Sequence, residues 1–240
     1  MSSLPDIELV FVSGVFEPGI WKHQRKYFDR CSQVETVGGK NFSALRDDVL
    51  ERLESCENAV VVGAEMGNHV VQSVEDHESV VSTVLTGPFD RPPFIGERSW
   101  GYGRKVLRHP KLARKFLFTE SEYRIVKEFL HMIEAPDFET YRSFLGKSLR
   151  VPVKNSLTIY NQGCRFSSMD AVEDLRPNSE TALLDAGSFS FFEKPQEYNK
   201  ALNDYLLGRK DILEKRRLVK SASENRSLKD FEDKLSLERT

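Results

Sequence analysis

The clearest structural signal in the chain is one stretch, Ala59-Val60-Val61-Val62-Gly63-Ala64-Glu65-Met66-Gly67-Asn68-His69-Val70-Val71. An alanine followed by three valines is typical of a strand that is buried on both faces of a parallel sheet. Gly63 and Gly67 indicate a tight turn, and the residues after them predict the start of a helix. We therefore expect a buried strand that turns sharply into a helix near Glu65.

The turn has the spacing of a known catalytic motif. Gly63-Ala64-Glu65-Met66-Gly67 matches G-x-S-x-G, the nucleophile elbow, in which a strand-to-helix turn presents a catalytic side chain. The middle position, where serine is usual, holds Glu65. The function of the chain therefore depends on what this carboxyl group does.

Composition limits the class of protein. The chain has 240 residues, 39% hydrophobic and 30% charged, with a formal net charge of −2. This length suits one soluble α/β domain, and the charge balance gives no reason to expect nucleic acid or an anionic membrane as a partner. The sequence shows neither a signal peptide nor an apolar run of the roughly 20 residues that span a bilayer.

The cysteines and histidines argue against a disulfide framework and a metal site. Cys31, Cys56 and Cys164 are widely spaced and odd in number, so we expect a reducing, cytoplasmic compartment. No cluster of His, Asp, Glu or Cys has the spacing of metal ligands, and we expect no cofactor.

Apolar runs alternate with amphipathic stretches, which predicts a layered α/β fold with a mostly parallel sheet. The expected strands are residues 7 to 12, 34 to 37, 59 to 62, 80 to 85, 156 to 160 and 181 to 185. The expected helices beside them are residues 21 to 31, 43 to 57 with Ser43 as the cap, 67 to 74, 169 to 175 and 195 to 207.

Residues 88 to 152 interrupt this alternation. They are rich in proline and glycine at the start and continue as three expected helices, residues 105 to 117, 120 to 133 and 138 to 145. We expect a helical cap over the sheet, inserted between core segments 1 to 87 and 153 to 208. Residues 209 to 240 are highly charged and predict either a solvated tail or a short docking helix.

Residues 5 to 208 resemble the α/β-hydrolase fold superfamily. Leu9-Val10-Phe11-Val12-Ser13-Gly14 looks like its first strand and oxyanion loop, which implies that Ser13, Gly14, Val15 and Met66 line the pocket. Leu184-Asp185-Ala186-Gly187-Ser188-Phe189, followed by Phe192-Glu193-Lys194-Pro195, looks like its C-terminal segment. The resemblance implies that Ser188 replaces the histidine base. It also implies that Gly163 or Cys164 replaces the acid, because the turn at residues 161 to 166 has no carboxylate.

A divergent member without the Ser/Asp/His triad leaves three functional hypotheses. The first is a catalytically degenerate protein that binds a small molecule or a protein, because Ser188 cannot activate water to release an ester of Glu65. The second is an enzyme in which Glu65 is a general acid/base, as a lyase, isomerase or atypical hydrolase. The third is an oligomerisation or scaffold unit, including a homo-oligomer.

Several further residues are candidates for the site. His69 follows Glu65 by four residues and either hydrogen-bonds it or packs against the sheet. Trp100, Tyr102 and His109 are candidates for a cap pocket. The basic start of the cap, with Arg91, Arg98, Arg104 and Lys105, suits either an anionic or aromatic ligand or a solvated loop. Glu65 itself, at a helix N-terminus, is also a candidate helix cap or a site for a cationic group.

Overall fold

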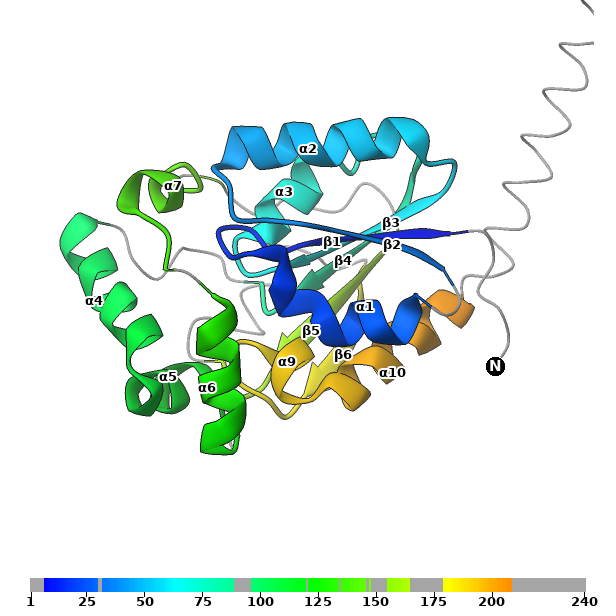
Figure 1. Ribbon diagram of the computed structural model, residues 1–240. Coiled ribbons are helices and arrows are strands. Elements are labelled where there is room, and N and C mark those ends of the chain that lie inside the picture. The colour runs from blue at the N-terminus through cyan, green and yellow to red at the C-terminus, as the bar shows by residue number, and fades with distance from the viewer. Residues whose placement is uncertain are drawn as a thin grey trace, which may run out of the picture.

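A computed structural model of the chain describes residues 7–29, 32–88, 96–119, 121–133, 135–145, 147, 155–164 and 179–208 (Figure 1). Within these residues, six strands form one parallel sheet in the order β2-β1-β3-β4-β5-β6. The strands are β1 (Glu8–Val12), β2 (Gln33–Val37), β3 (Ala59–Ala64), β4 (Val80–Thr86), β5 (Ser156–Asn161) and β6 (Glu180–Leu184). The expected α/β class with a mostly parallel sheet is confirmed.

Helices cover both faces of the sheet. Figure 1 shows α2 (Phe42–Ser55) and α3 (Gly67–Ser73) along one face. The other face is covered by η1 (Pro18–Trp21), α1 (Lys22–Phe28), α9 (Ser190–Glu193) and α10 (Pro195–Gly208). Between β4 and β5, at one end of the sheet, lie α4 (Glu97–Arg108), α5 (Pro110–Leu117), α6 (Tyr123–Met132) and α7 (Phe138–Arg142).

The central strands are fully buried, as the valine-rich sequences of β3 and β4 predict. Every residue of β3, β4 and β5 is buried, whereas the edge strands β2 and β6 have exposed positions. Helices on both faces exclude water from a parallel sheet, so its central strands need apolar side chains on both sides. Val12, the last residue of β1, pairs with Gly63, which sets the turn after β1 beside the turn that contains Glu65.

Two local expectations are wrong. The single helix expected at residues 105 to 117 is two helices, α4 and α5, separated by His109 with φ −116° and ψ 106°. Pro110 causes the break because it lacks an N–H and forces the residue before it into extended conformation. The cap of α2 is Asn41 rather than Ser43, since its Oδ1 accepts a hydrogen bond from the Ala44 N–H at 3.0 Å. The expected helix at residues 169 to 175 and the tail after residue 208 lie outside the described residues.

The turn between β3 and α3 is fixed by an amide clamp. Asn68 Nδ2 donates to the Thr86 carbonyl at 3.0 Å, and the Thr86 N–H donates to Asn68 Oδ1 at 3.2 Å. The Glu65 N–H also donates to the Thr86 carbonyl, at 3.4 Å. These bonds tie the first turn of α3 to the end of β4, so the position of Glu65 is set by the sheet itself.

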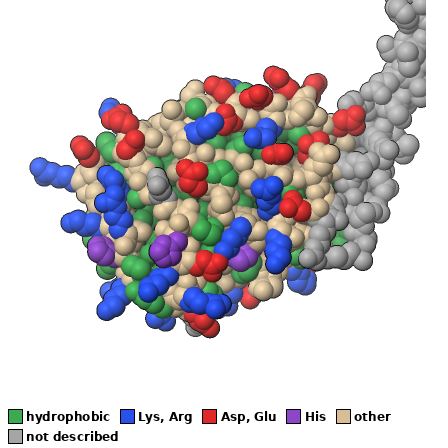
Figure 2. All heavy atoms as spheres, viewed as in Figure 1, with side chains coloured by type: hydrophobic (Ala, Val, Ile, Leu, Met, Phe, Trp, Pro, Cys, Tyr) green, Lys and Arg blue, Asp and Glu red, His purple; other side chains and the backbone are tan. Residues whose placement is uncertain are grey.

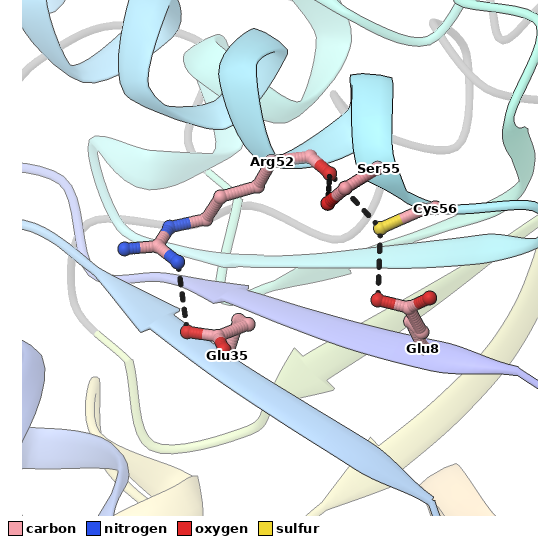
Figure 3. Close-up of polar contacts among 5 residues, drawn as sticks. All are labelled: Glu8, Glu35, Arg52, Ser55 and Cys56. Atoms are coloured by element: carbon pink, nitrogen blue, oxygen red, sulfur yellow. Dashed lines mark hydrogen bonds and ion pairs between the residues drawn. The ribbon is translucent and has the colours of Figure 1, made fainter.

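The amino end of the sheet has its own polar contacts, which Figure 3 shows. Arg52 on α2 donates to Glu35 on β2 at 2.9 Å, and the Cys56 Sγ lies 3.0 Å from Glu8 Oε2. Burial and then the Glu8 carboxylate raise the pKa of Cys56 to about 12, so this thiol stays protonated and unreactive. Among the described residues, no helix combines the length and apolar character needed to cross a bilayer.

The amide clamp makes a testable contribution to stability. Asn68→Ala removes the side-chain acceptor of the buried Thr86 N–H and leaves the Thr86 carbonyl with the longer hydrogen bond from the Glu65 N–H. We therefore expect a loss of about 2–3 kcal/mol in the free energy of unfolding. Chemical denaturation at neutral pH measures it. Asn41→Ala, which removes an exposed helix cap, is the matched control and should cost about 1 kcal/mol. Equal losses of unfolding free energy in the two variants would contradict the role of Asn68 as a buried clamp between α3 and β4.

Candidate functional site

Glu65 has an unusual backbone conformation. Its φ is +52°, and it is the one non-glycine residue with positive φ among the described residues. A side chain in this left-handed region costs roughly 1–3 kcal/mol and persists only where the surroundings impose it. The surroundings here include Gly67, where a Cβ atom would lie 2.2 Å from the Val12 carbonyl oxygen. The turn therefore needs glycine at position 67 and holds Glu65 in a strained conformation.

Glu65 faces a mainly apolar cavity of about 150 Å³. That volume matches an engineered apolar cavity that accommodates benzene. The cavity lies between the carboxyl ends of the strands and the helices α4 and α5. Among the described residues it is lined by Val15, Phe16, Glu65, Met66, Trp100, Tyr102, Gly103, Val106, Leu107, Phe116, Leu117, Ser188 and Phe189. Glu65 is thus a carboxyl group in a mainly hydrocarbon environment.

This environment changes the acidity of Glu65. Burial raises the pKa of its carboxyl to about 8, because the charged form loses its hydration without gaining a compensating partner. Its Oε1 is inaccessible to solvent and has no hydrogen-bond partner among the described residues. At neutral pH the carboxyl is therefore largely protonated, and near pH 8 it exchanges its proton readily.

Three polar groups meet around Gly87, the residue after β4. A Cβ atom at this glycine would lie 2.8 Å from Asn161 Nδ2, 3.5 Å from the Ser188 carbonyl oxygen and 3.8 Å from Glu65 Oε1. Asn161 Nδ2 donates to the Ser188 carbonyl at 3.1 Å, while its Oδ1 is buried and has no partner among the described residues. A side chain at position 87 would fill the space that these groups share.

Sequence reasoning did not identify Asn161. The available signal was its position as a polar residue at the end of a buried strand that leads to the expected site. Cys164, which the sequence makes a candidate for the position of the triad acid, is not among the residues that line the cavity. Its Sγ lies 3.3 Å from Ser188 Oγ. The structure thus brings Glu65 and Ser188 to one cavity and places Cys164 in contact with Ser188.

The loop that carries Ser188 is held by Glu193. The Glu193 carboxylate accepts hydrogen bonds from the Gly187 N–H at 2.7 Å and the Thr119 N–H at 2.9 Å. The Ser188 N–H donates to the carbonyl of Leu117 at 2.8 Å. Glu193 therefore joins this loop to the end of α5. In the sequence, Glu193 is notable only as part of the segment that resembles the C-terminal segment of the α/β-hydrolase fold superfamily, and that resemblance assigns it no role.

The turn after β1 supplies one wall of the cavity. Val15 lines it together with Met66, and the backbone N–H groups of these two residues make no hydrogen bond within the described part of the chain. Ser13 does not line the cavity. Its hydroxyl stabilises the turn by donating to the carbonyls of Phe16 and Val37, at 2.6 and 3.0 Å. Gly14, with φ +64°, lies directly against Met66 and Gly67.

The candidate histidines lie away from this cavity. His69 is buried on α3, and burial, followed by the charge of Lys147, lowers its pKa to about 4. Glu65 precedes α3 and has positive φ, so a spacing of four residues does not place the two side chains on one helical face. His109 is exposed at the break between α4 and α5 and is absent from the cavity lining, unlike Trp100 and Tyr102.

Comparison with known proteins identifies the fold. No protein-family model matches the sequence, and no curated protein sequence matches it. Solved structures do match. A thermophilic esterase from Thermogutta terrifontis is 18% identical with a TM-score of 0.68, covering 87% of this chain and 92% of that one. The enol-lactonase from Burkholderia xenovorans LB400 is 16% identical with a TM-score of 0.67, covering 84% and 91%.

The chain has the α/β-hydrolase fold. A third similar structure, Est816, an N-acyl homoserine lactone degrading enzyme, is 16% identical with a TM-score of 0.65 and covers 85% of this chain and 94% of its own. Because these neighbours are hydrolytic enzymes, the expectation of a catalytically degenerate binding protein is contradicted. The alternative, an enzyme that uses Glu65, fits the neighbours better.

The described residues contain no group of three His, Cys, Asp or Glu side chains that could hold a metal ion.

The raised pKa of Glu65 predicts how stability depends on pH. The folded state retains the proton up to about pH 8, whereas an ordinary glutamate releases it near 4.5. The folded state thus binds more protons between these values, so stability should fall as pH rises from about 4.5 to 8 and level off above. The slope from this group is at most about 1.4 kcal/mol per pH unit. Denaturation across this range should show that Glu65→Gln removes that part of the slope.

The control for that experiment is Glu97→Gln, which makes the same chemical change at an exposed position on α4. It should keep the pH dependence of the unmodified protein. If Glu65→Gln and Glu97→Gln have the same pH profile, Glu65 does not carry the raised pKa.

Proposed function

We propose that this protein is an atypical hydrolase in which Glu65 is a general base and general acid, and that it acts on a small, mainly apolar ester or lactone. The observation that carries the proposal is the position of Glu65. Its carboxyl, with a pKa near 8, faces a cavity that Val15 and Met66 also line, and the backbone N–H groups of these two residues have no hydrogen-bond partner among the described residues. The hydrolytic neighbours support a carbonyl substrate.

In the proposed mechanism, the substrate carbonyl oxygen accepts hydrogen bonds from the N–H groups of Val15 and Met66. Ionised Glu65 takes a proton from a water molecule, and the hydroxide formed attacks the carbonyl carbon. The two N–H groups stabilise the negative charge that develops on the oxygen of the tetrahedral intermediate. When the C–O bond breaks, protonated Glu65 returns its proton to the leaving alkoxide, which gives an alcohol and a carboxylic acid.

General-base chemistry suits this site better than a covalent intermediate. A covalent acyl intermediate on Glu65, which would be a mixed anhydride, would need a base to activate the water that cleaves it, and Ser188 has no basicity of that kind near neutral pH. A carboxyl with a pKa near 8, by contrast, exists in both protonation states around neutral pH. Such a group can take a proton in one step and return it in the next.

The apolar walls define the substrate class. Trp100, Val106 and Leu117 from α4 and α5 face Glu65 across the cavity, and we propose that these helices act as a cap that excludes bulk water. A cavity of about 150 Å³ suits a short acyl group or a small ring. Ser188 also lines the cavity and would orient the polar end of the substrate.

A second candidate reaction is proton transfer at the carbon next to the carbonyl, as in an isomerase or lyase. The apolar surroundings of Glu65 favour it, because a poorly hydrated carboxylate is a stronger base toward carbon acids. The same N–H groups would stabilise the enolate. Exchange of the α-hydrogen for deuterium without hydrolysis would identify this reaction.

Hydrolysis of p-nitrophenyl acetate and of a small lactone tests the first proposal. We expect kcat to rise with pH through an apparent pKa near 8, since ionised Glu65 is the base. Glu65→Gln should lower kcat/KM by about 10²–10⁴-fold, and the control Glu97→Gln should leave it unchanged. Activity that is insensitive to Glu65→Gln would contradict the proposal.

A single turnover in H₂¹⁸O separates the two ways in which Glu65 can act. A general base leads to ¹⁸O in the product acid and none in Glu65, because the carboxyl never bonds to the substrate. Attack of the Glu65 carboxylate on the carbonyl carbon would instead expel the alkoxide and form a mixed anhydride, and water that cleaves this anhydride at the Glu65 carbonyl would leave ¹⁸O in the Glu65 carboxyl. Mass spectrometry of the peptide that contains Glu65 measures this, and label in that peptide would overturn the general-base mechanism.

A further inference from the structure

A second cavity lies among α4, α5 and α6 and has a different chemical character. Its volume is about 770 Å³, and its described polar lining residues are Arg104, Arg108, Lys127 and His131. Figure 2 shows Lys, Arg and His side chains over the lower left of the molecule, where Figure 1 places these helices. All four polar side chains are basic, so the cavity is suited to a ligand of opposite charge.

Negative charge around this cavity is sparse. No Asp or Glu is among its described lining residues, and Glu134 lies outside the described part of the chain. Asp137 is exposed nearby; hydrogen bonds from Thr140 are the main reason that its pKa is lowered, with a small contribution from Arg104. The cationic groups are thus poorly compensated by the described residues of the protein.

Arg104 gives the most direct indication of a ligand. Its Nε is inaccessible to solvent and has no hydrogen-bond partner among the described residues. A buried guanidinium N–H without an acceptor is costly, and the planar fork of arginine matches the geometry of a carboxylate or phosphate. Because Nε is closed to solvent, an anion in the cavity would accept hydrogen bonds from the terminal nitrogens of the Arg104 guanidinium.

The rest of the lining is apolar. Leu107, Leu130 and Ile133 provide hydrocarbon surface beside the basic groups. A fully hydrated inorganic ion would gain nothing from these side chains, whereas an anion with a short hydrocarbon chain would bury that chain against them. We propose that this cavity binds a small organic anion, with its carboxylate or phosphate at Arg104 and Arg108 and its apolar part against Leu107 and Leu130.

The site is distinct from the Glu65 cavity but adjoins it. Leu107 lines both cavities and forms a shared wall between them. The ionisation of Glu65 is governed by burial, with no contribution from the basic residues of the second cavity. Binding of the anion therefore does not depend on the proposed hydrolytic activity, and it can be measured directly on an inactive variant.

Isothermal titration of the full chain with hexanoate, hexyl phosphate and 1-hexanol tests the proposal. We expect one of the two anions to bind, and the preferred one identifies the head group. Hexanol, with the same chain and no charge, should bind at least about tenfold more weakly. Equal binding of hexanol and both anions would overturn the proposal, as would the absence of binding by either anion.

Variants then locate the site. Arg104→Gln should weaken binding of the anion about tenfold or more, and Arg108→Gln, at an exposed position, should weaken it without affecting folding. Arg114→Gln removes an exposed arginine of α5 that does not line the cavity and is the matched control. Glu65→Gln should bind the anion normally. Unchanged affinity in both Arg104→Gln and Arg108→Gln, or loss of binding in Glu65→Gln, would overturn the assignment.

Discussion

The close contact between two turns is the constraint on which the rest of the site depends. A Cβ atom at Gly67 would overlap the Val12 carbonyl, and one at Gly14 would lie 2.5 Å from the Gly67 nitrogen. Because the turns touch without side chains between them, Val15 and Met66 open onto the same cavity. The same contact fixes the sharp exit from β3 that holds Glu65 at positive φ. One packing requirement therefore places Glu65, Val15 and Met66 around one small cavity.

The features of Glu65 that destabilise the folded state also suit it to proton transfer. Strain at positive φ and the burial of a carboxyl without a hydrogen-bond partner both destabilise the folded state. A packed leucine at position 65 would avoid the second cost. The burial that destabilises the ionised form is also what moves the pKa of Glu65 to about 8, where proton exchange is efficient near neutral pH.

Much of the sheet and the Glu65 turn could be predicted because their signals are local. Valine runs define β3, and the glycines around Glu65 define the turn. The roles of Asn161 and Glu193 could not be predicted, because each bonds a backbone group more than five residues away in the chain, at Ser188 and at Gly187 and Thr119 respectively. His69 illustrates a further difficulty. Helical spacing relates it to Glu65 only if both are in a helix, and α3 begins two residues after Glu65.

The distribution of charge differs between the two cavities, in a way that suits proton transfer at Glu65 and anion binding at the second cavity. Arg104 and Arg108 are on α4, the helix that also supplies Trp100 and Val106 to the Glu65 cavity. A cation directed at Glu65 would stabilise the carboxylate and lower its pKa, which would make it a weak base at every physiological pH. The pKa of Glu65 is instead raised by burial. The α4 helix contributes apolar side chains to the Glu65 cavity and basic ones to the second cavity. The carboxyl of Glu65 therefore remains able to gain and lose a proton near neutral pH, although positive charge lies on the same helix.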